Sequence, residues 1–350
     1  PVMGYVVGGA LSTGMVARTQ SRYGRKVSFQ LGLVVAFLSA LLCLYAAVTR
    51  NFWLLCAATV IAGYYNANAG LYRFAAAELA GPGGHEKAVS FVMAGGLLGA
   101  IIGPNLAART RNLFDVPFAG AYLALSVVAL LGMLALAFIT FPPVPPKKAG
   151  QQGRPLSQIM KQPVFIVAAA TGALSFGVMN LLMAATPIAM QQCGLPFSDA
   201  ALVLEWHVIG MFAPGFFTGN LIKRFGTLPV MGVGIALYLG CIAIALSGVD
   251  LHQFLIALFL LGVGWNFVFT GSTTLSLTAY RPEEKDRAQG ALNFFVFATL
   301  ALSSLASGVL VTTQGWTLLN QGSLLPVLAT ALALLWLVLH RRRAQNPVSN

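Results

Sequence analysis

The sequence contains little charge: only 9% of its 350 residues are Asp, Glu, Lys or Arg, whereas soluble domains carry about 25%. So few charges cannot cover a globule with water-facing surface, which excludes a soluble enzyme, a disordered chain and a coiled coil. The same composition excludes a disulfide scaffold, and the four cysteines are scattered and form no CxxC pair. The motifs GxxxxGK[ST], HExxH and GxSxG are also lacking, so the chain alone is neither an ATP-driven pump nor a hydrolase of those types.

Apolar sequence is abundant instead, at 57% of the residues, with a mean hydropathy of +0.79. A helix needs about 20 residues to cross about 30 Å of hydrocarbon. Runs near that length predict a polytopic, all-α membrane protein with about eleven transmembrane helices. Charged residues, Gly and Pro delimit these runs at 1–17, 28–48, 52–72, 89–108, 117–140, 163–190, 200–221, 228–248, 252–278, 290–312 and 322–340.

The segment 141–162 is the long polar stretch of the chain, and its Pro, Gly and Lys content is typical of a linker. Alternate connections, together with Arg73 at the inner end of its helix, hold 18 of the 21 basic residues, including those of the linker and of the tail 341–350. Because basic loops remain in the cytoplasm, we expect the linker and the tail to be cytoplasmic. The first run then passes inward, which indicates an earlier helix if the N-terminus is also inside.

The two halves of the sequence resemble each other. The stretch 17–24 (Ala-Arg-Thr-Gln-Ser-Arg-Tyr-Gly) corresponds to 219–226 (Gly-Asn-Leu-Ile-Lys-Arg-Phe-Gly) at an offset of 202. At an offset of 200, Tyr65-Asn66 corresponds to Trp265-Asn266, and Lys87-Ala88 to Arg287-Ala288. Three correspondences at nearly one offset predict two similar halves. If each half holds six helices, one is missing at the N-terminus.

These motifs resemble those of the major facilitator superfamily. Arg22, Gly24 and Arg25 fit its loop pattern Gly-x-Leu-Ala-Asp-Arg-x-Gly-Arg-Lys, although Ser21 replaces the Asp. The second copy keeps Gly219, Arg224 and Gly226 and also lacks the Asp, so we expect the gate that this Asp stabilises in the family to be weaker or made otherwise. Gly99, Gly103 and Pro104 are similar to the helix motif of its antiporter branches, and close helix packing is the alternative reading.

The resemblance implies a fold of two pseudo-symmetric six-helix bundles. Residues 1–140 would form helices 2–6, without the first helix, and residues 163–340 helices 7–12. It also implies a secondary transporter that alternates access to a midplane site. We expect proton-coupled export of a small organic solute. The alternatives are facilitated or proton-symport uptake, and a membrane receptor or subunit that transports nothing.

Several polar side chains lie at membrane depth. In the family, helices at these positions line the central cavity, so the resemblance implies that they contact substrate: Tyr65, Asn66, Asn68, Asn180, Trp265 and Asn266. An aromatic ring beside an amide, at two corresponding positions, suits a flat or amphipathic organic molecule. The alternative role is hydrogen bonding between helices, worth about 0.6 kcal/mol each.

Ionisable residues are costly in hydrocarbon, and two of them lie within the run 200–221. Glu205 and His207 are candidates for proton coupling, with a structural hydrogen bond as the alternative. Two residues apart on a helix, they point about 200° apart and cannot both face one cavity. Nearer a helix end, we expect Arg73 and Glu78 to form a surface pair or a gate.

The net charge of +12 is explained by basic cytoplasmic loops, so we expect no nucleic-acid partner. We also expect no enzyme activity, no cofactor and no metal site. The expected partners are the lipid bilayer, a small-molecule substrate and protons. The expected form is a monomer in a plasma membrane, the inner membrane of a bacterium.

Overall fold

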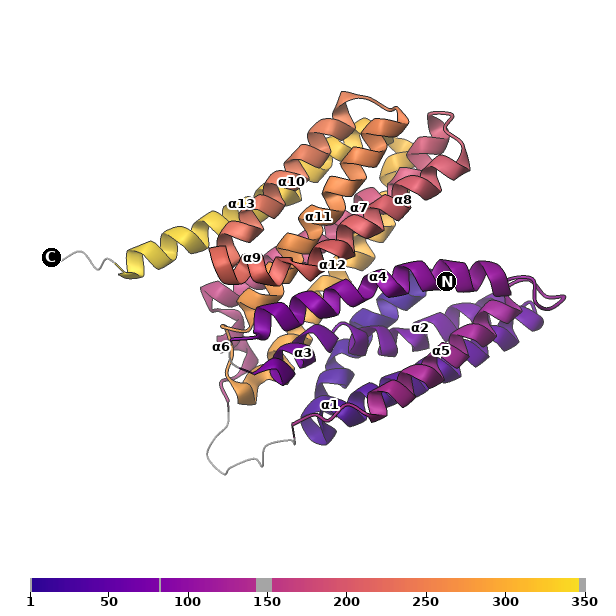
Figure 1. The fold of residues 1–350 in the computed structure, drawn as a ribbon, viewed down its shortest axis with the longest axis horizontal. Coiled ribbons are helices and arrows are strands. Elements are labelled where there is room, and N and C mark those ends of the chain that lie inside the picture. The colour runs from indigo at the N-terminus through magenta and orange to yellow at the C-terminus, as the bar shows by residue number, and fades with distance from the viewer. Residues whose placement is uncertain (1, 82, 143–152, 346–350) are drawn as a thin grey trace. The chain divides into compact units, whose positions relative to one another are not determined.

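The computed structural model describes residues 2–81, 83–142 and 153–345, and within these ranges the regular structure is entirely helical (Figure 1). The elements before the linker are α1 (Val2–Val48), α2 (Phe52–Ala69), α3 (Tyr72–Ala80), α4 (His85–Thr110) and α5 (Ala119–Ala137). Those after it are α6 (Leu156–Met160), α7 (Pro163–Gln192), α8 (Phe197–Phe212), η1 (Ala213–Phe216), α9 (Thr218–Phe225), α10 (Thr227–Ser247), α11 (Leu251–Ser276), η2 (Pro282–Glu284), α12 (Lys285–Thr313) and α13 (Gly315–Gln345).

Eight helices of the described chain are long and apolar enough to cross a membrane, or nine if α8–η1 and α9, bent by 52°, form one span. The helix α1 counts once here, but Gly24, with φ 84° and ψ 173°, divides it into 2–23 and 25–48. Ten of the eleven predicted runs fall on these candidate spans, the bent pair included, and the run 52–72 falls on the helix α2, so the expected all-α membrane fold is confirmed. Several helices begin before the apolar run does, as α12 does at Lys285, because helical hydrogen bonding continues into polar sequence beyond the hydrocarbon.

The chain forms two compact units. Unit 1 comprises 1–79, 98–156 and 281–301. In it, α1 packs against α2 and α5 (Figure 1). The backbones of α1 and α2 touch where glycines meet, since a Cβ on Gly63 would lie 2.3 Å from the carbonyl carbon of Gly8. Lys26 and Gln30 bind carbonyl oxygens at the end of α5 at 2.7 and 2.9 Å.

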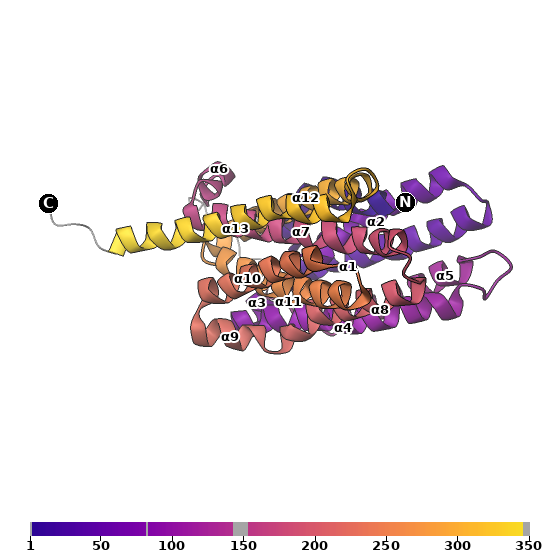
Figure 2. The ribbon, with the colours of Figure 1, turned by 90° about the horizontal axis from the view of Figure 1, so that it is seen from above.

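Unit 2 comprises 80–97, 157–280 and 302–350. The helix α11 lies at its core, packed against α7, α8 and α10, and the neighbouring α10 and α11 are also seen in Figure 2. Small residues again permit close approach, since a Cβ on Gly264 would lie 2.9 Å from the Gly234 carbonyl oxygen. Hydroxyls complete the packing, because Tyr238 donates to the Ser175 carbonyl at 2.9 Å and Ser272 to the Ala168 carbonyl at 2.7 Å.

The sequence repeat also appears in the backbone. Gly24 has φ 84° and ψ 173°, and its counterpart Gly226 has φ 90° and ψ 160°. A side chain rarely adopts such a conformation, so glycine is required where one helix ends and the next begins. The cations that precede these glycines are also placed alike, with Arg22 5.2 Å above the Tyr23 ring and Arg224 5.1 Å above the Phe225 ring.

Each unit includes the first part of a helix that the repeat assigns to the other half. Unit 2 takes 80–97, and unit 1 takes 281–301, which is the same stretch about 200 residues later. In unit 2, Ser90 accepts the Gly219 N–H at 2.9 Å, and in unit 1 a Cβ on Gly290 would lie 2.9 Å from the Ala17 methyl carbon. These are corresponding contacts. The domain bounds 1–140, 141–162, 163–340 and 341–350 stay predictions, and residues 143–152 and 346–350 lie outside the described residues.

Candidate functional site

Four aromatic rings surround the middle of α11 in unit 2. Trp265, which is 2% exposed, stacks on Phe269 with 5.0 Å between ring centroids and an angle of 13°. Phe176 of α7 and Phe212 of α8 meet the indole edge-on, at 5.3 and 5.9 Å. Within the described chain the indole N–H has no hydrogen-bond partner. In this conformation the cluster is closed, and a conformation that opens it would present an aromatic face and one hydrogen-bond donor to a flat ring.

The neighbouring Asn266 has its hydrogen bonds satisfied inside unit 2. Its side-chain oxygen accepts from the Thr218 hydroxyl at 2.7 Å, and its amide donates to the Met211 carbonyl at 2.7 Å. Met211 and Thr218 lie on the two sides of the bend between α8 and α9. In this conformation Asn266 therefore stabilises the bend.

Two further candidate amides also bond within the protein. Asn180 of α7 donates to the hydroxyls of Ser303 and Ser304 on α12, both at 2.9 Å. Asn68 of α2 is fully buried, accepts from Ser28 at 2.8 Å and donates to the Tyr64 carbonyl at 3.1 Å. The interhelical role that was the alternative for these residues is thus present in the structure.

Tyr65 and Asn66 in unit 1 are only half-buried. The Asn66 amide packs closely over Gly9, since a Cβ built there would be 3.4 Å from its Nδ2 and 3.3 Å from the Phe297 ring. Unlike that of Asn68, the side chain of Asn66 makes no hydrogen bond to the described residues. Tyr65, Asn66 and Trp265 are therefore the candidates whose side-chain polar groups have no hydrogen-bond partner in the described chain, and of these the Trp265 N–H is buried in this conformation.

The two ionisable residues of α8 have opposite surroundings. Glu205 is exposed on the protein surface, whereas His207 is completely buried. The imidazole Nδ1 lies 2.7 Å from the Leu258 carbonyl oxygen on α11, so Nδ1 carries the proton and donates. Its Nε2 has no partner in the described chain. His207 thus bonds a neighbouring helix, and Glu205 is the group open to its surroundings.

An ionic network in unit 1 surrounds Arg25 of the first loop motif. The guanidinium, 4% exposed, lies 2.5 Å from Glu78 and also donates to the side-chain oxygens of Gln20 and Gln289. Lys285 binds Glu78 at 2.8 Å. Burial alone would raise the pKa of the Glu78 carboxyl on α3, but the hydrogen bonds from Arg25 and Lys285 hold the pKa below its usual value.

This arrangement corrects the expected pairing of Arg73 with Glu78. Arg73 instead donates to the Asn293 side chain at 3.1 Å, and the partner of Glu78 comes from the preceding loop motif. The sequence did contain a signal for part of the network, because Lys285 and Asp286 correspond at offset 200 to His85 and Glu86.

The end of the linker binds η2, directly before α12, through a second ion pair. The side chain of Arg154 donates to both carboxylate oxygens of Glu284, at 2.8 and 2.7 Å, which raises the pKa of Arg154. The backbone N–H groups of Arg154 and Arg281 add bonds of 2.8 and 2.9 Å to the same carboxylate, which is 1% exposed. Four donors satisfy this buried charge, as a buried carboxylate requires.

The antiporter-type motif lies on an exposed stretch of α4. Gly99, Gly103 and Pro104 are all exposed, and a Cβ on either glycine would meet no described atom within 4 Å. These glycines are not used for close packing in this conformation. No group of three or more His, Cys, Asp or Glu suited to a metal ion occurs among the described residues.

Comparison with known proteins identifies the family. A model of the Major Facilitator Superfamily matches residues 1–213 and again residues 170–350. The chain belongs to this superfamily. This family consists of membrane transporters rather than enzymes. The expectations of a transporter and of no enzyme activity are therefore confirmed at the level of the family.

Two relatives of this major facilitator protein match most of its length. The riboflavin transporter RfnT of Brucella anthropi is 38% identical over 323 residues, which are 91% of this chain and 81% of the relative. The uncharacterized MFS-type transporter YddS of Bacillus subtilis is 26% identical over 347 residues, 94% of this chain and 80% of the relative.

Solved structures show the same fold. The Escherichia coli fucose:proton symporter FucP superposes with a TM-score of 0.75 over 95% of this chain and 88% of its own, at 16% identity. The human organic anion transporter MFSD10 gives a TM-score of 0.73 over 94% and 82%, also at 16% identity. At that identity the likeness concerns the fold alone, and it agrees with the expected major facilitator fold.

Proposed function

We propose that this protein is a secondary transporter of riboflavin or of a closely related flat, hydroxylated heterocycle. The observation that carries this proposal is the 38% identity to a riboflavin transporter over 91% of the chain. That level of identity over both halves includes the helices that bear Tyr65, Asn66 and Trp265. We further propose alternating access as the mechanism, as the fold implies.

The aromatic cluster suits such a solute chemically. The flavin ring system is planar and carries carbonyl oxygens, so it can stack on an aromatic face and accept a hydrogen bond from the buried Trp265 N–H. The Asn66 amide can bind the sugar-like hydroxyls of the side chain with both its donor and its acceptor. We propose these two residues, with Tyr65, as substrate contacts.

The substrate is tested by flux in proteoliposomes, with the intrinsic fluorescence of riboflavin as the readout. Trp265→Ala should reduce uptake of riboflavin strongly, because it removes both the ring and the donor, whereas Trp265→Phe should retain stacking and lose only the hydrogen bond. Leu339→Ala, on the exposed surface of α13, is the matched control. Absence of riboflavin flux by the wild-type protein would refute the proposed substrate.

We propose export as the direction and proton antiport as the coupling, with uptake as the alternative. Export is favoured by the similarity of Gly99, Gly103 and Pro104 to the antiporter helix motif. For the proton we propose Glu205, because its carboxylate is exposed on a membrane-spanning helix while the neighbouring His207 is engaged with Leu258.

Coupling is tested by imposing a pH gradient on vesicles of defined orientation. Glu205→Gln should abolish accumulation against the gradient while leaving exchange intact, since a neutral amide cannot release a proton. His207→Gln serves as the comparison, and it should leave coupling in place. If Glu205→Gln concentrates riboflavin as well as the wild type does, the proton is carried elsewhere. Accumulation only in the inward direction would establish uptake.

We propose the inner membrane of a bacterium as the location, with the linker and the tail on the cytoplasmic side. The charge bias supports this topology, since 18 of 21 basic residues fall on one side of the predicted helices. A cysteine introduced at Arg343, in a variant lacking the four native cysteines, should react with a membrane-impermeant maleimide only after the cells are opened. Labelling of intact cells would reverse the orientation.

A further inference from the structure

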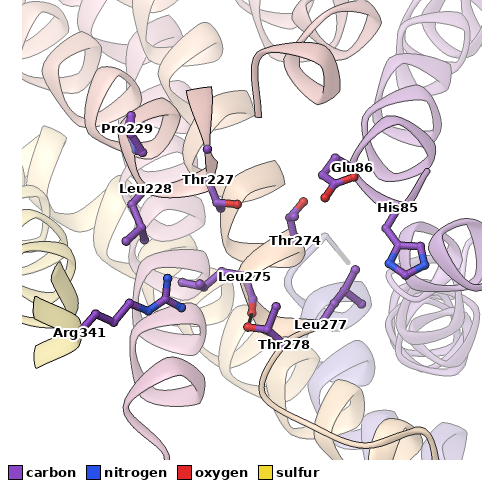
Figure 3. A pocket seen from close by; sticks show the side chains of 11 residues that line it. His85, Glu86, Thr227, Leu228, Pro229, Thr274, Leu275, Leu277, Thr278 and Arg341 are labelled. Atoms are coloured by element: carbon purple, nitrogen blue, oxygen red, sulfur yellow. Dashed lines mark hydrogen bonds between the residues drawn. The ribbon is translucent and has the colours of Figure 1, made fainter. Parts of the chain in front are cut away.

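A pocket of about 410 Å³ lies within unit 2, away from the aromatic cluster (Figure 3). It forms where the starts of α4 and α10 meet the end of α11 and the last turns of α13, on the side predicted to be cytoplasmic. This volume is in the range of sites for small organic molecules. Its polar side chains are His85, Glu86, Thr227, Thr274, Thr278 and Arg341.

The internal repeat explains why no side chain fills the space inside this pocket. The positions that correspond to Thr227, Thr274 and Thr278 in the first half are Arg25, Phe74 and Glu78. In unit 1, Phe74 is completely buried, and Arg25 and Glu78 form the ion pair of 2.5 Å. Three large side chains there correspond to three threonines here, so the space that the ion pair and the ring fill in unit 1 is open in unit 2.

The pocket also lacks the cation that its counterpart contains. Glu86 corresponds to Asp286, and in unit 1 the guanidinium of Arg25 lies 3.9 Å from the Asp286 carboxylate. Thr227 replaces that guanidinium in unit 2. Within the described chain Glu86 has no ion-pair partner, and Figure 3 shows Arg341 at the opposite wall of the pocket.

One buried hydroxyl points into this space without a partner. Thr274 is 7% exposed, its Oγ1 makes no hydrogen bond within the described chain, and its side chain points into the pocket (Figure 3). A buried polar atom without a partner is costly, and a bound ligand would satisfy it. The carboxylate and this hydroxyl both accept hydrogen bonds, so together they favour a cation that carries N–H groups.

We propose that this pocket binds a small organic cation with N–H donors, a guanidinium or a primary ammonium group, at the position that the Arg25 guanidinium occupies in unit 1. Glu86 accepts charge-assisted hydrogen bonds from it, and Thr274 accepts a further one. Arg341 lies where it would bind an acidic group at the other end of the ligand. This site is separate from the proposed substrate contacts and does not depend on the identity of the transported solute.

Calorimetry on the purified full chain in detergent tests the site, with methylguanidinium as the probe and an amine-free buffer. Wild-type protein should bind it saturably, and Glu86→Gln should weaken the affinity about tenfold or more, as the loss of a charged hydrogen bond predicts. Glu283→Gln, an exposed carboxylate outside the pocket, is the matched control. Absence of saturable binding, or equal affinity of Glu86→Gln and wild type, would overturn the proposal.

Two comparisons separate this chemistry from simple charge attraction. Tetramethylammonium has the charge without N–H donors and should bind much more weakly than methylguanidinium, and equal binding would refute the role of the donors. The zwitterion 4-guanidinobutyrate should bind more tightly than methylguanidinium, and Arg341→Gln should remove that advantage. If Arg341→Gln leaves the difference unchanged, the assignment of the acidic end is wrong.

A double variant introduces the ion pair of unit 1 at the corresponding positions of unit 2. In Thr227→Arg/Thr278→Glu the chain supplies its own guanidinium and carboxylate, so methylguanidinium binding should disappear while the unfolding temperature rises. Binding as in the wild type would place the probe elsewhere and overturn the proposal.

The natural source of the cation is tested by measuring methylguanidinium binding in nanodiscs. Competition by phosphatidylethanolamine but not by phosphatidylcholine indicates a lipid headgroup, and no competition by either lipid indicates a soluble cation. Both results are consistent with the site.

Discussion

Substitution of Arg25 by Ala should destabilise the protein substantially. The guanidinium is 4% exposed and bonds Glu78, Gln20 and Gln289, so its removal takes hydrogen-bond donors from three side chains. Breaking a buried ion pair costs about 3–5 kcal/mol. Lys285 remains 2.8 Å from Glu78, whose side chain is 20% exposed, so we expect the lower end of that range, about 3 kcal/mol.

The measurement is reversible unfolding in detergent by titration with sodium dodecyl sulfate, followed by tryptophan fluorescence. Arg22→Ala is the matched control, because Arg22 lies in the same loop, is exposed and contacts only the adjacent Tyr23 ring in the described structure. It should change the free energy of unfolding by less than about 0.5 kcal/mol. Arg25→Lys should recover part of the loss, since lysine restores the charge but not the planar set of donors. A loss for Arg25→Ala no larger than that for Arg22→Ala would refute the buried network.

Three further outcomes follow from the described contacts. Arg154→Ala should destabilise the protein by about 2 kcal/mol, because the buried Glu284 keeps only a backbone donor from Arg281 and a weakened one from residue 154. Arg154→Lys should restore part of the lost free energy of unfolding in the same titration. Asn266→Ala should cost about 1–3 kcal/mol through its two lost hydrogen bonds, whereas Asn66→Ala should leave stability unchanged and lower flux. Because the pKa of Glu78 is lowered in the folded protein, its contribution to stability is present above about pH 4.3 and is lost as the pH falls through the folded-state pKa. Glu78→Gln should therefore reduce the loss of stability at acid pH in a measured curve of stability against pH.

The helices were predictable from the sequence because the bilayer imposes one simple requirement on each of them. A run of about 20 apolar residues satisfies that requirement whatever it packs against, and all eleven runs fall on helices. The repeat was also readable, because the break at each loop motif needs a glycine with positive φ, and Gly24 and Gly226 both provide it.

The roles of individual polar residues were less predictable. Asn66 and Asn266 occupy corresponding positions in the sequence, yet the Asn266 side chain bonds Thr218 and Met211 while the Asn66 side chain makes no hydrogen bond to the described chain. The difference depends on which helix packs against each amide, and that is set by tertiary structure. Glu78 is a similar case, since its partner Arg25 is 53 residues away and becomes its neighbour only when α1 and α3 are in place.

The side chain of Asn266 holds the bend between α8 and α9 at its present angle. Asn266 holds the Met211 carbonyl on one arm and the Thr218 hydroxyl on the other, so opening or closing the 52° angle would break two hydrogen bonds at a cost of about 2 kcal/mol. We therefore expect α8 and α9 to move together. Glu205 lies on one arm and the second loop motif, ending at Gly226, closes the other. If Glu205 carries the proton, as proposed, we expect a change in its charge to alter the position of the second loop motif as well, because the hydrogen bonds of Asn266 connect the two helices.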